Sequence, residues 1–333
     1  MYKNKIIKLF SLLFSVILLC TVFASCKSNT HKNDSGTGDD KEETITMNKD
    51  HVIVCFGDSI TEGMRMARSD CYPSVLKANI NNDDFEVLNS GVGGEGSYTI
   101  SARANALEFT VTNDITFNKG VKEVLCDWKL FSGINGEEMK FRYGTMGREL
   151  PITKLVIDGK PYTLRFEYGN TEEEGRYYLG RQDVSSAETI KVGSKCQFNY
   201  SDYFDKPYCI VVLMGANDGN IDTATLISRY QAIADTCERF IAIIPHFRPK
   251  SAAEFKAAFG DRCVNLYEYC TTKVFEDYGF EKTPEDELDI KAGRMPRSVL
   301  LNNNVGDCHL NEKGYKALGD LVYQKGVELG YWN

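Results

Sequence analysis

Residues 52–63, Val-Ile-Val-Cys-Phe-Gly-Asp-Ser-Ile-Thr-Glu-Gly, combine an apolar run with a polar turn. The apolar run Val52–Phe56 predicts a buried strand, and Gly57-Asp58-Ser59 predicts the turn that follows it. A serine in this position lies at the carboxyl edge of a sheet, where open α/β folds bind their ligands. The stretch therefore predicts an α/β fold that presents Ser59 at its functional edge.

Strands and helices alternate along the rest of residues 51–100 and again from about residue 207 onward. This alternation predicts a parallel sheet that helices cover on both faces. The strands expected after the first are Phe85–Leu88, Tyr208–Met214, Ile241–Pro245 and Cys263–Tyr267. One expected helix starts at Tyr72. The other expected helices cover Thr223–Phe240, Ala252–Phe259 and Asn311–Leu329.

Residues 101–206 break this rhythm with short alternating runs separated by Asn, Asp and Gly. We expect an inserted domain of antiparallel β structure, in which Asp158-Gly159 forms a hairpin turn. The insertion falls between a glycine-rich turn and the strand before Asn217, so we expect it beside the functional edge. The strands expected in it are Leu107–Val111, Lys140–Tyr143, Lys154–Ile157 and Tyr162–Phe166.

The N-terminus is typical of an exported protein. Lysines at positions 3, 5 and 8 lie at the start of an apolar run that extends to Leu19, as in a signal peptide. Val22-Phe23-Ala24-Ser25-Cys26 resembles a bacterial lipobox, which implies a lipoprotein signal over residues 1–26 and lipid on Cys26. Phe23 stands where that pattern prefers Leu, so a plain signal peptide or a retained anchor helix are the alternatives. Residues 27–48 are polar and predict a flexible tether.

Composition limits the partners and cofactors. The chain has 333 residues, a net charge of -8 and no basic cluster, which argues against nucleic-acid binding. Nine cysteines follow Cys26, an odd number without close pairs, so they predict no disulfide framework. The sequence has no Gly-x-Ser-x-Gly elbow, phosphate-binding loop or His-Glu-x-x-His motif. We therefore predict neither a metal nor a cofactor.

Four short motifs occur in a fixed order: Gly57-Asp58-Ser59, Asn89–Gly94, Gly215–Asp218 and Asp307–Asn311. Each motif alone is weak, but the ordered set resembles the SGNH (GDSL-type) hydrolase family of serine esterases. The resemblance covers residues 51–100 and 207–333. It implies a flavodoxin-like three-layer α/β/α SGNH hydrolase fold, built by a discontinuous domain of residues 49–100 and 207–333 around the insertion.

The resemblance also implies the roles of individual residues. Ser59 would be the nucleophile and His309 the general base. The oxyanion would be held by the N–H of Ser59, the N–H of Gly94 and the side-chain amide of Asn217. Water would then release a covalent acyl-enzyme.

The sequence departs from the family pattern at the third catalytic residue. The family usually has aspartate three residues before the histidine, and that position is Gly306. Asp307, two residues before, either orients His309 or leaves a Ser-His dyad that a backbone carbonyl orients. Asp58 is expected to fix its turn through hydrogen bonds, and His246 is the reserve candidate for the base.

The predicted function is that of a lipid-anchored surface esterase that hydrolyses acyl esters, with O-acetyl groups on carbohydrate as the expected substrate. The insertion's tyrosines would stack on sugar or, alternatively, form ordinary β-sheet core. One alternative function is a non-catalytic carbohydrate-binding protein on a decayed esterase fold. Another is a nucleotide-dependent oxidoreductase, because Gly91-x-Gly93-x-x-Gly96 matches a dinucleotide fingerprint. That match is weakened because β-like sequence is expected after Gly96.

Overall fold

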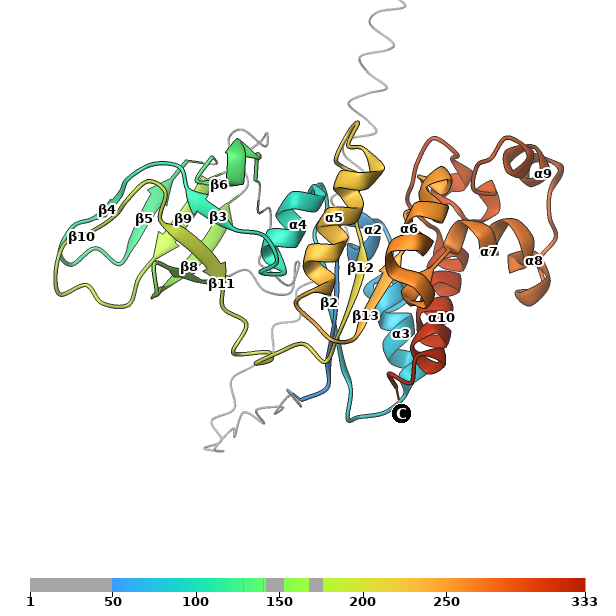
Figure 1. Cartoon of the computed structure of the whole chain (residues 1–333), viewed down its shortest axis with the longest axis horizontal. Coiled ribbons are helices and arrows are strands. Elements are labelled where there is room, and N and C mark those ends of the chain that lie inside the picture. The colour runs from blue at the N-terminus through green and yellow to red at the C-terminus, as the bar shows by residue number, and fades with distance from the viewer. Residues whose placement is uncertain (1–49, 128, 140, 142–152, 168–175, 333) are drawn as a thin grey trace, which may run out of the picture. The chain divides into compact units, whose positions relative to one another are not determined.

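A computed structural model describes residues 50–332 except 128, 140, 142–152 and 168–175 (Figure 1). The predicted signal, the lipid site Cys26 and the tether lie outside the described residues, as does most of the expected strand Lys140–Tyr143. In the part of the chain that is described, no helix combines the length and apolar character needed to cross a membrane.

Five parallel strands form the central sheet, in the order β14-β13-β12-β1-β2. Numbered along the chain as first to fifth, these strands run 2-1-3-4-5 across the sheet, which is the flavodoxin-like order. The order reverses between β1 and β12, and ligands bind at such a reversal. The predicted fold class is confirmed. The strands are β1 Val52–Gly57, β2 Glu86–Gly91, β12 Cys209–Leu213, β13 Phe240–Ile243 and β14 Cys263–Val264.

Helices cover both faces of this sheet, and the strand sequences show why. Every residue of β1 is buried, so its side chains alternate between two apolar layers rather than between core and water. Ile53 and Cys55 belong to the layer of α3 and α10, whereas Val54 and Phe56 belong to the layer of α4, α5 and α6. The first layer contains α3 Tyr72–Ile80, α7 Leu266–Thr272, α8 Val274–Asp277 and α10 Glu312–Glu328. The second contains α4 Ser97–Arg103, α5 Thr223–Ala234 and α6 Ala252–Phe259, and α9 spans Pro284–Lys291.

The insertion forms an antiparallel sheet of seven strands, in the order β5-β9-β8-β7-β11-β3-β6, and a separate pair of β4 with β10. Asp158 (φ 46°) and Gly159 (φ 80°) both have positive φ and join β7 to β8, which is the two-residue hairpin that their sequence predicts. The strands are β3 Phe109–Val111, β4 Ile115–Phe117, β5 Glu123–Cys126, β6 Phe131–Gly133, β7 Thr153–Ile157, β8 Lys160–Glu167, β9 Arg176–Gly180, β10 Glu188–Ile190 and β11 Lys195–Phe198.

Helix α4 joins the insertion to the α/β body. The expectation of β-like sequence after Gly96 is wrong, because α4 begins at Ser97 and the expected boundary at residue 101 falls inside it. Tyr98 of this helix accepts a hydrogen bond from the N–H of Ile134 (2.8 Å) and donates one to the carbonyl of Glu108 (2.8 Å). The insertion and one layer of the body consequently share one apolar core.

Other element boundaries also differ from expectation, among them the end of β2, which extends to Gly91 rather than Leu88. Helix α5 ends at Ala234, and Phe240, expected in that helix, begins β13. Strand β14 ends at Val264 because the side chain of Asn265 accepts a hydrogen bond from the N–H of Glu268 and caps α7.

Candidate active site

Ser59 is the first residue of the short helix α2 (Ser59–Glu62), which follows β1 directly. The preceding Asp58 is the N-cap, and its carboxylate accepts hydrogen bonds from the N–H groups of Ile60 (3.0 Å) and Ala216 (3.3 Å). Because Asp58 does the capping, the Ser59 hydroxyl is not used to cap the helix. Asp58 thus fixes its turn, as expected, and also joins it to the turn after β12.

The environment of Asp58 is unusual for a carboxylate. The side chain is fully buried, and this burial raises its pKa from 3.8 to about 6, although the two N–H donors and His309 act in the opposite direction. A carboxylate held at the switch point of the sheet by two backbone N–H groups fixes the relative position of Ser59 and Asn217.

His309 lies beside Ser59 although the two residues are far apart in sequence. The imidazole Nε2 is 2.8 Å from the Ser59 hydroxyl oxygen. His309 belongs to the loop before α10, and this loop is held at both ends: the carbonyl of His309 accepts from the N–H of Leu301 (2.9 Å), and Asn311 caps α10. The structure therefore brings the predicted nucleophile and the predicted base within hydrogen-bond distance.

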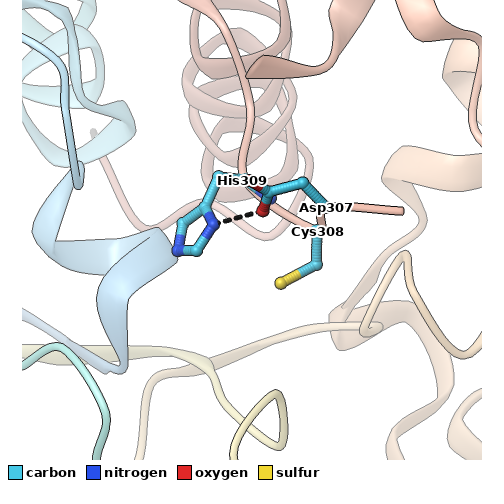
Figure 2. A group of neighbouring side chains, drawn as sticks. All are labelled: Asp307, Cys308 and His309. Carbon is cyan, nitrogen blue, oxygen red and sulfur yellow. Dashed lines mark hydrogen bonds and ion pairs between the residues drawn. The ribbon is translucent and has the colours of Figure 1, made fainter. Parts of the chain in front are cut away.

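Asp307 lies on the other side of the imidazole (Figure 2). Its Oδ1 is 2.5 Å from His309 Nδ1 and also accepts a hydrogen bond from the His309 backbone N–H at 3.0 Å. Burial opposes the ionised form of Asp307, but these two hydrogen bonds and the charge of His309 outweigh it and hold its pKa below 3.8. An ionised Asp307 places the proton on Nδ1, so Nε2 is left to accept the proton of Ser59.

His246, the reserve candidate for the base, lies behind this loop. It is 2 % exposed, and its Nε2 lies 2.7 Å from the carbonyl of Cys308. Because a carbonyl only accepts, His246 must donate from Nε2. Burial lowers the pKa of His246 from 6.5 to about 4, so this histidine is neutral near pH 7. Its contact supports the loop of His309, and among the described residues it is His309 that hydrogen-bonds to Ser59.

The two other predicted oxyanion donors lie on adjacent turns. Gly94 has a φ of 79°, a conformation that favours glycine, and its N–H has no hydrogen-bond acceptor within the described residues. Asn217 is exposed, and its side-chain amide donates one hydrogen bond to the carbonyl of Glu95 at 3.0 Å. The second amide hydrogen of Asn217 is left for a ligand.

A buried ion pair behind these donors is not apparent from the sequence. Arg103 donates from Nε to Glu95 (2.6 Å), from Nη1 to Ser90 (2.6 Å) and from Nη2 to the carbonyl of Gly57 (3.1 Å). Both charged side chains are 0 % exposed. Arg103 thus joins the ends of β1 and β2 to the loop that carries Gly94. No local motif indicates this role, because the three partners meet only in the folded chain.

The glycine-rich turn does precede a helix, as a dinucleotide fingerprint requires. Protein groups occupy the space around it, however. The carboxylate of Asp218 accepts from the N–H of Ser97 at the start of α4 (2.9 Å), and a Cβ on Gly91 would lie 2.0 Å from the N atom of Glu62. A carboxylate at the helix start competes with a pyrophosphate, so this geometry argues against a dinucleotide site.

One group of potential metal donors lies at the same place. Asp307, Cys308 and His309 offer one ligand atom each, all within 4.8 Å of one another (Figure 2). Asp307 and His309 already hydrogen-bond to each other there, and burial raises the pKa of the Cys308 thiol to about 11. A metal ion at this position would engage the carboxylate and the imidazole that already hydrogen-bond to each other beside Ser59.

Comparison with known proteins gave matches to solved structures alone. No family model and no curated protein matches the sequence. One similar structure is a protein from Desulfitobacterium hafniense DCB-2 assigned to the lipolytic G-D-S-L family (TM-score 0.33, 11% identity, covering 82% of this chain and 98% of that one). Another is described as a peptidoglycan O-acetylesterase in action (TM-score 0.32, 12% identity, covering 85% of this chain and 92% of that one). Both TM-scores lie below 0.5, and we therefore base the proposal below on the geometry of this chain.

Proposed function

We propose that this chain is a serine ester hydrolase. The observation that carries the proposal is the continuous series of contacts from Asp307 through His309 to Ser59, at 2.5 and 2.8 Å. Acyl transfer by a serine requires a hydroxyl, an imidazole and a carboxylate that contact one another in this order.

In the proposed reaction, Ser59 attacks the ester carbonyl and gives its proton to Nε2 of His309. The charge that develops on the carbonyl oxygen is stabilised by the N–H of Ser59, the N–H of Gly94 and the free hydrogen of Asn217. Collapse of this intermediate breaks the ester C–O bond, and His309 returns the proton to the departing alcohol. A water molecule, activated in turn by His309, then releases the acid from Ser59.

We further propose that the esterase acts outside the cell. The lipobox-like residues before Cys26 support lipid modification of that cysteine and anchoring at a bacterial surface. Substrates that occur there include O-acetyl groups on carbohydrate, which is the substrate class we favour. The polar surroundings of Gly94 and Asn217 support an ester whose alcohol is polar.

The alternative of a decayed, non-catalytic fold depends on the missing aspartate at position 306. Asp307 makes the contact that an aspartate at 306 would make, so this support is removed. The dinucleotide-dependent alternative is disfavoured because Asp218 occupies the start of α4.

Hydrolysis of 4-nitrophenyl acetate and longer esters by the full-length chain tests the proposal. Ser59→Ala should lower kcat by at least about 1,000-fold, since it removes the nucleophile. Ser185→Ala, an exposed serine of the insertion, serves as the matched control. Equal turnover of the Ser59→Ala variant and the wild type would contradict the proposal.

A further inference from the structure

A cavity of about 750 Å³ opens beside the proposed oxyanion donors. Gly94 and Asn217 line it. The start of α4 and Arg229 from α5 also line it, and the insertion contributes Glu137 and Glu138. A substrate whose carbonyl oxygen lies at Gly94 and Asn217 would therefore extend into a space that the insertion helps to enclose.

Hydrogen bonds and ion pairs of Arg229 hold the wall of this cavity in place. Arg229 is only 10 % exposed, and it donates to Ser97 (2.8 Å) and Asp218 (3.3 Å) on the body side. On the insertion side it donates to Oε1 of Glu137 at 2.7 Å. Glu137 remains 46 % exposed, so a buried guanidinium holds a carboxylate that a ligand can still reach.

Negative charge exceeds positive charge in this wall. Among its described residues, Arg229 is the one cation, whereas Glu95, Glu137 and Asp218 supply carboxylates. Arg103 offsets Glu95 from behind, and Arg229 is shared between Glu137 and Asp218. Oδ2 of Asp218 is buried and receives no hydrogen bond from the described part of the chain. One guanidinium thus serves two carboxylates, and an anionic ligand beside them would meet a net negative charge.

The carboxylates of the wall also favour a ligand that donates hydrogen bonds. Carboxylates accept hydrogen bonds from hydroxyl and ammonium groups, and they gain nothing from an alkyl chain. On the basis of the proposed function, we infer that this cavity holds the alcohol half of the ester. It accepts a neutral or amine-bearing polyol such as a sugar, and it discriminates against a polyol that carries a carboxylate.

Three glycosides with the same ring test this inference: methyl glucoside, methyl glucosaminide and methyl glucuronide. Their dissociation constants for the full-length chain, measured by NMR titration near pH 7 and low salt, require no turnover. The glucuronide should bind roughly tenfold more weakly than the glucoside, and the glucosaminide at least as tightly as the glucoside. The difference should shrink as the ionic strength rises.

An isosteric variant assigns the effect to the wall. Glu137→Gln should bring the glucuronide and glucoside constants closer together, because it leaves Arg229 less neutralised. Glu167→Gln, which removes an exposed carboxylate elsewhere in the insertion, should leave their ratio unchanged. Equal binding of the glucuronide and the glucoside, or no binding of any of the three, would overturn the inference.

Hydrolysis of 4-nitrophenyl acetate, whose leaving group carries no sugar, is measured on the same samples. Turnover without the glycoside preference would refute the cavity inference and leave the esterase proposal standing. The glycoside preference without turnover would refute the esterase proposal and leave only a sugar-binding cavity.

Discussion

Asp307 occupies a position in the sequence that differs by one residue from the family pattern, yet its carboxylate reaches His309. The loop allows this because Oδ1 of Asp307 accepts from both the ring Nδ1 and the backbone N–H of His309. The same oxygen thus fixes the backbone and the ring together. A carboxylate two residues before the histidine therefore reaches the imidazole in this loop.

Asp307→Asn should lower kcat for 4-nitrophenyl acetate by up to about 10⁴-fold, because it no longer fixes the tautomer in which Nε2 accepts a proton. KM should change little, since Asp307 does not contact the substrate in the proposed reaction. The matched control is Asp205→Asn, an exposed aspartate far from His309 in the sequence. If Asp307→Asn retains wild-type kcat, the site operates as a Ser-His dyad.

His246 makes the folded protein less stable as the pH falls. Its pKa is about 4 in the folded chain and 6.5 ordinarily, so the unfolded chain takes up the proton first as the pH falls. Stability from the neutral imidazole is therefore complete above pH 6.5 and is lost as the pH falls towards 4. The full loss amounts to about 3 kcal/mol, on the order of 1.4 kcal/mol for each pKa unit.

His246→Gln removes this titration, and the free energy of unfolding should reveal it in denaturant titrations at pH 7.5 and 4.5. The wild type should lose about 2 to 3 kcal/mol more than the variant between these two pH values. Asp58 titrates in the same range with the opposite sign, because its raised pKa favours folding at low pH. It is present in both proteins and cancels from the difference. An identical loss in both proteins would refute the assignment.

At the scale of elements, the active-site edge depends on one buried side chain that touches three of them. Arg103 of α4 contacts the end of β1 through Gly57, the end of β2 through Ser90 and the glycine-rich loop through Glu95. The carbonyl of Glu95 in turn holds the amide of Asn217. Arg103 is therefore a positioning residue for both Gly94 and Asn217.

Arg103→Met should lower kcat by about 100- to 1,000-fold, similar to the loss of an oxyanion donor. It should also destabilise the fold by about 3 to 5 kcal/mol, because it removes the cation of a buried ion pair. The double variant Arg103→Met/Glu95→Gln separates the two effects. It should recover most of the stability in denaturant titrations while kcat stays low. Recovery of kcat together with stability would show that the ion pair has a purely structural role.

The accuracy of the sequence-based prediction differs between element types. Buried parallel strands such as Val52–Gly57 and Cys209–Leu213 are predictable nearly to the residue, because a short continuous apolar run between turn residues favours a strand that is buried on both faces. Helix α4 is not predictable in this way, because Ser97-Tyr98-Thr99-Ile100 has the residue types of a strand, and tertiary packing overrides that preference. The proximity of Ser59 and His309 is predictable from the ordered motifs, and the structure places the two side chains 2.8 Å apart.

The side chains that hold these residues together are not predictable from such motifs. Arg103, Glu137 and Arg229 acquire their roles from partners 8 to 132 residues away along the chain. Such contacts follow from the topology, which places the ends of β1 and β12 together and directs the insertion towards them. Asn265 is different, since an asparagine before Leu266 is a local helix-start signal from which the start of α7 is predictable.

At the scale of the whole described body, the inserted sheet and the α/β layers share one continuous apolar core. A series of aromatic rings shows the connection: Phe198 of β11 stacks near Tyr200 (6.3 Å between ring centroids), and Tyr200 meets Phe56 of β1 at 6.4 Å. All three side chains are buried. Because no polar boundary separates the two parts within the described residues, we expect the insertion and the body to unfold together.

Phe198→Ala tests this cooperativity from the insertion side. Removing a ring that also packs on Phe109 and Phe141 should destabilise the insertion by about 3 to 5 kcal/mol. The chain has two tryptophans, so a Trp128→Phe background leaves Trp332, which is buried in the opposite layer of the body, as the single reporter. If the body unfolds with the insertion, the free energy of unfolding reported by Trp332 fluorescence should fall by the same amount as that reported by circular dichroism. An unchanged Trp332 midpoint would instead show that the insertion unfolds on its own, and the cavity wall that it supplies could then open without unfolding the body.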